Sequence, residues 1–323
     1  MIKQILPEIF RIEVPLPGNP LKATNSYLIK GRDRNLMIDT GMNRSECKAA
    51  LEYAFCKLEV EPKRTDLFIT HLHADHLGLA SFIATDTSKI YFNEPDATSI
   101  YRGGFWDFAS EAIRKNGFPE TILQQAIDNH PAKRYLVVEK LPFTILGEGD
   151  KITVGNYRFT CVETPGHTHG HLCLYEEDEK ILISGDHILD DITPNISYLD
   201  GTENPLADYL ASLEKIKGYD VDLVLPGHRR LIEDCRRRIE ELKQHHRARI
   251  NEVLAALADG PQNAYKVASK MKWDIVSDDW DTFPLMQKWF ATGEALAHLR
   301  YLEVKGVVKR KTDAGDQIVF TLS

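Results

Sequence analysis

Residues 71–76 read HLHADH and place three histidines and one aspartate directly after the apolar run DLFIT. That run predicts a strand, and in an extended chain alternate side chains share a face. We therefore expect His71, His73 and Asp75 to point to one side and His76 to point elsewhere. Two imidazoles spaced two residues apart bind a transition metal well, and Asp75 with His76 would serve a second metal beside the first.

Three further strand-like segments end in a tight turn that is followed by a candidate ligand. FTCVETPGH ends at His167, KILISGDH carries Asp186, and VDLVLPGH ends at His228. Each one alone is more often a turn residue than a ligand, but a metal motif is supported by its context. Ligand sites of α/β proteins usually form at the carboxyl ends of strands. Together with HLHADH, the three segments predict a metal centre.

The first two thirds of the chain alternate between short β-branched runs and helical segments, which predicts an α/β layered domain. The strand-like runs are residues 25–31, 35–41, 66–73, 88–94, 150–167, 180–187 and 221–228. Residues 45–58 and 204–218 have helical patterns between them. Residues about 95–145 interrupt the strand pattern and predict a mostly helical insertion, which is either a substrate cover or a plain surface excursion.

The C-terminal part of the sequence has a different pattern. After His228 a long helical segment runs to Gly260-Pro261, and two more helices and a hairpin around DAGD follow it. This order of elements is typical of a winged helix. We expect a catalytic domain over residues 1–244 and a winged-helix-like domain over residues 245–323, which packs over the active-site edge or forms a homodimer contact.

Composition excludes several classes of protein. The 323 residues are 43% hydrophobic and 27% charged, and the sequence contains no apolar run of membrane-spanning length. An odd number of cysteines, five, without a CxxC pair predicts reduced thiols and a cytoplasmic protein. The formal net charge of −8 favours a small-molecule substrate over a nucleic-acid partner, which would need concentrated Lys and Arg.

The HxHxDH motif, the three later ligands and Asp39 in MIDTG together resemble the metallo-β-lactamase superfamily over roughly residues 1–235. The resemblance implies an αββα sandwich with a dinuclear site at one edge of its sheets. It implies that Asp186 bridges the two metals and that Asp39 orients the ligand loop. By the same resemblance, the ligands of the first metal are His71, His73 and His167, and those of the second metal are Asp75, His76 and His228.

The implied chemistry is hydrolysis by a metal-bridging hydroxide, with Asp75 as the catalytic residue that steers its proton. Two divalent ions are expected; His and Asp ligands suit zinc, and iron or manganese would also fit. His169, His171 and His187 flank the motifs and match no ligand position. We expect them to lie behind the ligands or on the surface, with His187 the best candidate for a substrate or proton contact.

The substrate is less constrained than the metal site. THLHADHLG most resembles the glyoxalase II-like group, which cleaves thioesters, so a thioester or ester is the first hypothesis. The C-terminal region resembles that of β-lactamase-like proteins, one branch of which is an endoribonuclease, so a phosphodiesterase is the second. A lactonase and an iron persulfide dioxygenase are further alternatives. Lactonases carry a tyrosine shortly after the bridging aspartate, where this chain has His187 and Leu189.

Overall fold

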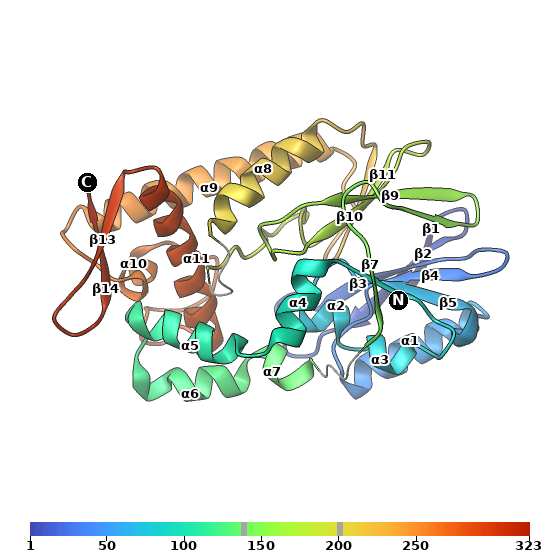
Figure 1. Cartoon of the computed structure of the whole chain (residues 1–323), viewed down its shortest axis with the longest axis horizontal. Coiled ribbons are helices and arrows are strands. Elements are labelled where there is room, and N and C mark those ends of the chain that lie inside the picture. The colour runs from blue at the N-terminus through green and yellow to red at the C-terminus, as the bar shows by residue number, and fades with distance from the viewer. Residues whose placement is uncertain (137–140, 199–202) are drawn as a thin grey trace. The chain divides into compact units, whose positions relative to one another are not determined.

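The computed structural model describes residues 1–136, 141–198 and 203–323, and the chain divides into two compact units (Figure 1). Unit 1 comprises Met1–Arg102, Arg134–Pro194 and Ser212–Ile239. Unit 2 comprises Gly103–Lys133, Asn195–Ala211 and Glu240–Ser323. Helices α8 (Pro205–Lys217) and α9 (Cys235–Leu257) each begin in one unit and end in the other.

Unit 1 contains a seven-stranded sheet in which the strands follow one another in chain order. Its strands are β1 (Ile2–Leu6), β2 (Ile9–Pro15), β3 (Ala23–Ile29), β4 (Asn35–Ile38), β5 (Thr65–Phe68), β6 (Ile90–Phe92) and β7 (Phe143–Ile145). The first four strands pair antiparallel, whereas β4 to β7 pair parallel. The parallel strands are joined by helical segments, as parallel pairing requires a long crossover.

The second sheet of unit 1 has five strands in the order β12-β11-β10-β9-β8. Their bounds are β8 (Lys151–Val154), β9 (Tyr157–Glu163), β10 (Leu172–Glu176), β11 (Ile181–Gly185) and β12 (Leu223–Pro226). All pairs are antiparallel except β11 with β12, which is parallel. The strands β10 and β11 are buried at every position, which fits their mainly apolar sequences.

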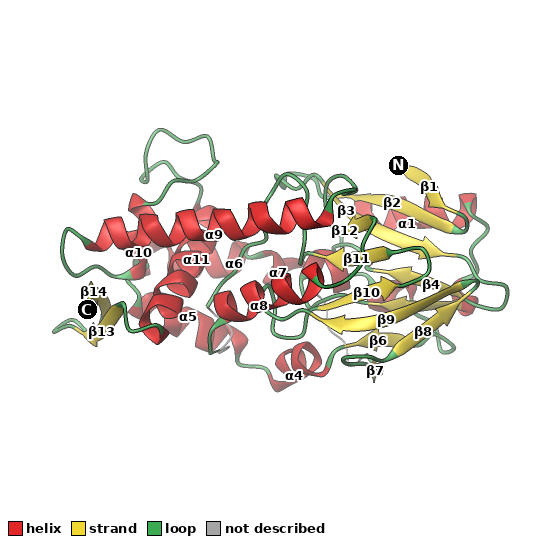
Figure 2. Ribbon diagram, turned by 90° about the horizontal axis from the view of Figure 1, so that it is seen from above, coloured by secondary structure: helices red, strands yellow, loops and turns green. Residues whose placement is uncertain are grey.

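The two sheets pack face to face around one core, and helices cover their outer faces (Figures 1 and 2). Tyr27 and Phe68 of the first sheet meet Phe159 and Leu174 of the second in this core. On the outer face of the first sheet, a second core includes α1 (Ser45–Lys57), α2 (Ala74–Leu77) and α3 (Ala80–Ile83). The C-terminal half of α8 contacts the second sheet's loops, where Ser212 donates to the Pro165 carbonyl at 2.8 Å. The predicted αββα layering is therefore observed.

The parallel pairs decide where the site forms. Because β4 and β5 run the same way, the residues after them, Asp39 and the HLHADH motif, leave the same edge of the first sheet. β11 and β12 do the same for Asp186 and His228 in the second sheet. The sandwich thus gathers four chain segments that are far apart in sequence.

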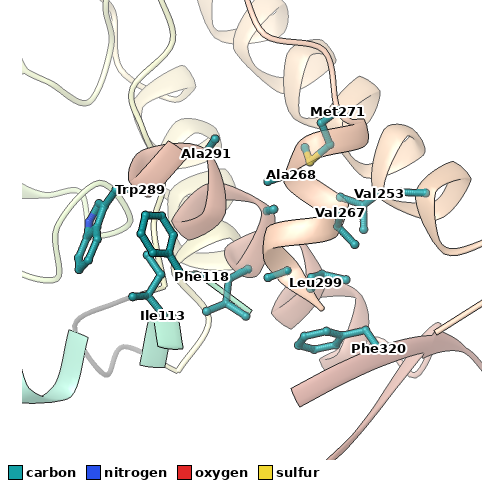
Figure 3. Close-up of a cluster of buried hydrophobic side chains, with 14 of the residues drawn as sticks. Ile113, Phe118, Val253, Val267, Ala268, Met271, Trp289, Ala291, Leu299 and Phe320 are labelled. Atoms are coloured by element: carbon teal, nitrogen blue, oxygen red, sulfur yellow. The ribbon is translucent and has the colours of Figure 1, made fainter. Parts of the chain in front are cut away.

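Unit 2 is mainly helical. It contains α5 (Phe105–Lys115), α6 (Glu120–Asn129), most of α9, α10 (Ala264–Lys270), α11 (Leu285–Val304) and the hairpin β13 (Val308–Thr312) with β14 (Ile318–Leu322). Figure 3 shows its core, in which Phe118 from the loop between α5 and α6 lies with Trp289 and Leu299 of α11 and Phe320 of β14. No described helix is both long and apolar enough to cross a bilayer.

The secondary structure of the C-terminal region matches the sequence analysis, but the division of the chain differs from it. The predicted order of three helices and a hairpin is observed as α9, α10, α11 and β13–β14. The predicted insertion is mostly helical, with α4 (Glu94–Arg102) to α7 (Pro131–Tyr135), and it ends in β7; its residues 137–140 lie outside the described part. Residues 103–133 and 195–211 group with the C-terminal region in unit 2, because their apolar side chains pack into its core.

Unit 2 also buries a pair of histidines. His246 Nδ1 lies 3.2 Å from His298 Nε2, and His298 Nδ1 donates to the Glu294 carbonyl at 2.8 Å. Burial lowers the pKa of His298 to about 3 and lowers that of His246 well below its usual range. Both imidazoles are therefore neutral in the folded chain at pH values where the unfolded chain protonates them.

We predict that the stability of unit 2 falls as the pH drops from 6.5 toward 3. The unfolded chain binds more protons in this range, so the free energy of unfolding decreases by up to about 1.4 kcal/mol per pH unit for each buried imidazole. All four tryptophans, Trp106, Trp273, Trp280 and Trp289, lie in unit 2, so tryptophan fluorescence in denaturant titrations follows it. His298→Asn should reduce this pH slope by about one proton; an unchanged slope would contradict the assignment.

Candidate metal centre

The HLHADH motif follows β5 as predicted, but its second half is helical. His73 is the N-cap residue of α2, and the amide of His76 donates to the His73 carbonyl at 3.0 Å. The expectation that His76 points away from Asp75 is therefore wrong: the helical turn brings both side chains to the same site. The strand-like pattern could not reveal this turn, because it carries no capping or glycine signal at His73.

The first group of candidate ligands is a set of three imidazoles. His73 Nδ1 lies 3.0 Å from His71 Nε2 and 3.0 Å from His167 Nε2, so the three nitrogens face one point. Burial, with neighbouring imidazoles next in importance, lowers the pKa of His71 well below its usual range and that of His73 to about 3. His71 and His73 therefore stay neutral, and neutral imidazole is the form that binds a metal.

Asp186 lies at the centre of the site. Its Oδ1 is 3.5 Å from His76 Nε2, and its Oδ2 is 3.5 Å from both His167 Nε2 and His228 Nε2. On the far side, Asp75 Oδ2 lies 3.3 Å from His228 Nε2 and 3.9 Å from His76 Nε2. One carboxylate thus borders the imidazole trio on one side and the group of Asp75, His76 and His228 on the other.

The histidine pKa values in this second half of the site shift in the opposite direction to those of His71 and His73. Burial would lower the pKa of His228, but the carboxylates of Asp186 and Asp75 raise it to about 10. Burial also opposes the charged form of His76, and Asp39 with the site's other carboxylates raises its pKa well above the usual range. Burial would raise the pKa of Asp75, but His76 and His228 lower it to about 2.

The outward nitrogens of the ligands are fixed by hydrogen bonds. His76 Nδ1 donates to Asp39 Oδ2 at 2.7 Å, and His228 Nδ1 donates to the Ala23 carbonyl at 2.8 Å. His71 Nδ1 is 3.0 Å from Thr70 Oγ1, which itself donates to Asp39 at 2.9 Å. Such bonds fix the imidazole tautomer and leave the inward nitrogen as the lone-pair donor. Asp39 therefore supports two ligands, one directly and one through Thr70, a residue that the sequence analysis missed.

Asp39 itself has φ +56°, in the left-handed region that Asp tolerates better than most residues. A Cβ on Gly227 would lie 2.5 Å from Asp186 Oδ1 and 2.8 Å from His76 Cε1. The glycine before His228 is thus required for the close approach of that loop to the centre, not only for a tight turn.

The three flanking histidines have different positions. His169 is exposed, whereas His171 and His187 are buried. His171 Nε2 accepts a hydrogen bond from the Asp186 amide at 3.2 Å, and its Nδ1 bonds Thr164 Oγ1 at 2.8 Å. His171 thus contacts the backbone of a candidate ligand, and the substrate or proton contact expected of His187 stays a prediction.

The side chains fit a bound metal. Three overlapping groups bring their ligand atoms within 4.8 Å of one another: His71, His73 and His167; His71, His76 and Asp186; and Asp75, His76 and His228. Among the described residues, His76 Nε2, His228 Nε2 and Asp186 Oδ1 are buried without a hydrogen-bond partner. Buried polar atoms are almost always paired, so these three inward atoms are suited to a cation.

Comparison with known proteins identifies the family. The family model described as the metallo-beta-lactamase superfamily matches residues 19–228. The chain belongs to the metallo-beta-lactamase superfamily. A second model, the C-terminal domain of metallo-beta-lactamase-like proteins, matches residues 250–323. This superfamily hydrolase therefore carries an additional domain that is itself a recognised type, and whether that domain is a winged helix stays a prediction.

Relatives of the chain extend over its whole length. It is 26% identical over 317 residues to the probable metallo-hydrolase YqjP of Bacillus subtilis, which covers 93% of this chain and 94% of the relative. It is 28% identical over 222 residues to the human acyl-coenzyme A thioesterase MBLAC2, and the match covers 63% of this chain and 72% of the relative. The crystal structure of the metallo-beta-lactamase family protein TTHA1429 from Thermus thermophilus matches this chain with a TM-score of 0.85 at 29% identity. The match covers 99% of this chain and 100% of that one.

We predict that His228→Ala lowers the divalent metal content per chain, because it removes one of the three candidate ligands in the group with Asp75 and His76. His169→Ala is the matched control: it removes an exposed imidazole two residues from both His167 and His171 and should leave the metal content unchanged. Elemental analysis of both purified variants after dialysis measures the difference. Equal metal content in His228→Ala and wild type would contradict a role for this group.

Proposed function

We propose that this metallo-hydrolase holds two divalent metal ions side by side and hydrolyses acyl thioesters of a small carrier thiol. The observation that carries the dinuclear part is the position of Asp186. Its Oδ2 lies 3.5 Å from both His167 Nε2 and His228 Nε2, and its Oδ1 lies 3.5 Å from His76 Nε2, so one carboxylate contacts both ligand groups. A carboxylate shared in this way suits a bridge between two cations, which typically lie about 3.5–4 Å apart in such sites.

In this proposal His71, His73 and His167 hold one ion, and Asp75, His76 and His228 hold the other. A donor set of imidazoles and carboxylates suits zinc, and also iron or manganese. Bound ions would supply a Lewis acid for the substrate carbonyl oxygen and would lower the pKa of a coordinated water toward neutrality.

The ligands differ in exposure, which suggests how a substrate enters. His73, Asp75 and His167 are partly exposed, whereas His71, His76, Asp186 and His228 are buried. The partly exposed part of the site therefore includes Asp75, whose side chain is 13% exposed. The pKa of Asp75, about 2, keeps its carboxylate charged at neutral pH.

Hydrolysis of a thioester breaks the acyl carbon–sulfur bond and forms a carbon–oxygen bond to the oxygen of water. Asp75 accepts a proton from that water at its carboxylate and then delivers it to the departing thiolate. General acid–base transfer of this kind typically contributes about 10²–10⁴-fold to the rate. The reaction needs no serine or cysteine nucleophile from the chain.

The thioester class is supported by the relative named as an acyl-coenzyme A thioesterase and by the motif's likeness to the glyoxalase II-like group. The nucleic-acid alternative has less support. Residues Lys309, Arg310 and Lys311 form the dense basic run of β13, and Arg310 is paired with Glu303 at 2.9 Å. A nucleic-acid reader usually presents a free basic face.

We predict that Asp75→Asn lowers kcat/KM for thioesters by about 100-fold or more, because the amide can no longer accept and deliver the proton. The measurement is thiol release from acyl-coenzyme A and S-acylglutathione substrates. Asp86→Asn, which alters an exposed carboxylate remote from the motifs, is the control and should retain wild-type rates. A metal chelator should abolish the activity of the wild-type chain.

Competing substrates belong in the same experiment. Lactones, phosphodiesters and RNA should be tested with one metal-quantified preparation, in which about two ions per chain are expected. RNA cleavage without thioester cleavage would replace the proposal with a nuclease. Oxygen consumption with glutathione persulfide and one iron per chain would replace it with the dioxygenase.

A further inference from the structure

Asp96 is a fully buried carboxylate that belongs to none of the metal-binding motifs. It lies in the first turn of α4, about twenty residues after HLHADH and seventy before His167. A buried aspartate is rare and costly unless its oxygens are paired. The partners of this carboxylate therefore indicate why it is buried.

The partners of Asp96 come from the two loops that carry the imidazole trio. Its Oδ2 accepts the amide of Leu72 at 2.9 Å and the hydroxyl of Thr168 at 2.8 Å. Its Oδ1 accepts the amide of Gly170 at 2.7 Å. Leu72 stands between His71 and His73, and Thr168 directly follows His167. One side chain thus joins the loop of two ligands to the loop of the third.

The packing at Gly170 shows how closely the second loop approaches α4. A Cβ at this position would lie 2.6 Å from the Asp96 amide nitrogen and 2.7 Å from its carboxyl carbon. Distances this short are not tolerated, so only glycine lets the loop reach the carboxylate. The bases of the same two loops are joined separately, where the Leu172 amide donates to the Thr70 carbonyl at 2.9 Å.

We propose that Asp96 is a positioning residue that holds His71, His73 and His167 at metal-binding separation before any metal is bound. The bond between Leu172 and Thr70 fixes where the loops start, whereas Asp96 fixes their tips, within one residue of each ligand. Charge-assisted hydrogen bonds to an ionised carboxylate are about twice as strong as neutral ones, so a single aspartate can order two loops. This role of Asp96 at the metal centre does not depend on which substrate is hydrolysed.

Asp96→Asn tests the proposal with little change of shape. The amide keeps one acceptor oxygen, but its NH₂ group faces a backbone N–H or the Thr168 hydroxyl, so at least one of the three bonds is lost. Thr168→Val removes one bond and leaves the carboxylate in place, so it should have the smaller effect. The matched control is Asp66→Asn: Asp66 is also buried and bonded to Arg34 and to the Lys89 amide, at the other end of β5.

Metal affinity is the main readout, measured by competition between the metal-free chain and a chromophoric chelator for Zn²⁺. Loss of a group that orients metal ligands typically costs about 10–100-fold in affinity. We expect that loss for Asp96→Asn, a smaller one for Thr168→Val and none for Asp66→Asn. Hydrogen exchange of the metal-free chain gives a second readout: peptides that contain Leu72 and Gly170 should exchange faster in Asp96→Asn only.

Each alternative outcome is distinguishable. Wild-type Zn²⁺ affinity and wild-type exchange in Asp96→Asn would overturn the proposal. An equal loss of affinity in Asp66→Asn would also overturn it, because the effect would then follow from general destabilisation of unit 1. A wild-type chain that binds Zn²⁺ but cleaves no thioester would refute the proposed substrate and leave the role of Asp96 intact.

Discussion

The site depends on hydrogen bonds to the nitrogens that face away from it. A neutral imidazole, the form that binds a metal, has one donor and one acceptor nitrogen, so holding the outer one as a donor leaves a lone pair on the other. Asp39 holds His76 in this way, and the Ala23 carbonyl holds His228. Their inner nitrogens then point toward Asp186. The orientation of the candidate ligands therefore depends on outer contacts that are made by one aspartate, one threonine and one main-chain carbonyl.

The candidate ligands could be predicted from the sequence, and the structure brings them together, because each stands in a motif of fixed spacing at the end of a strand. Their supports could not be predicted, because Thr70, Asp96 and His171 carry no motif and act only through partners that folding brings near. Asp96 is an example: its three partners are 24 to 74 residues away along the chain. The helical turn at Ala74 was missed for a related reason, since the apolar run before it has the period of a strand.

The fold was predictable where local pattern and tertiary contact agree. The central strands and the C-terminal helices were found, because their apolar periodicity matches the faces that they bury. The first fifteen residues, which form β1 and β2, lie outside the strand-like runs that the sequence predicts. Residues 103–133 and 195–211 were assigned by sequence continuity to the catalytic domain, yet side chains such as Ile113 and Phe118 complete the core of unit 2. Only three-dimensional packing assigns such segments.

Burial of the ligand set also links metal binding to folding. Each buried polar atom without a partner costs about 1–3 kcal/mol, and among the described residues His76, His228 and Asp186 each contribute one to the site. A ligand that binds only the folded chain stabilises it by about 4.1 kcal/mol at a thousand times its Kd. Ions bound at this strength are enough to offset the cost of a few unpaired atoms. A cation bound at this centre would therefore stabilise the fold of unit 1, because it would supply the partners that these buried atoms lack.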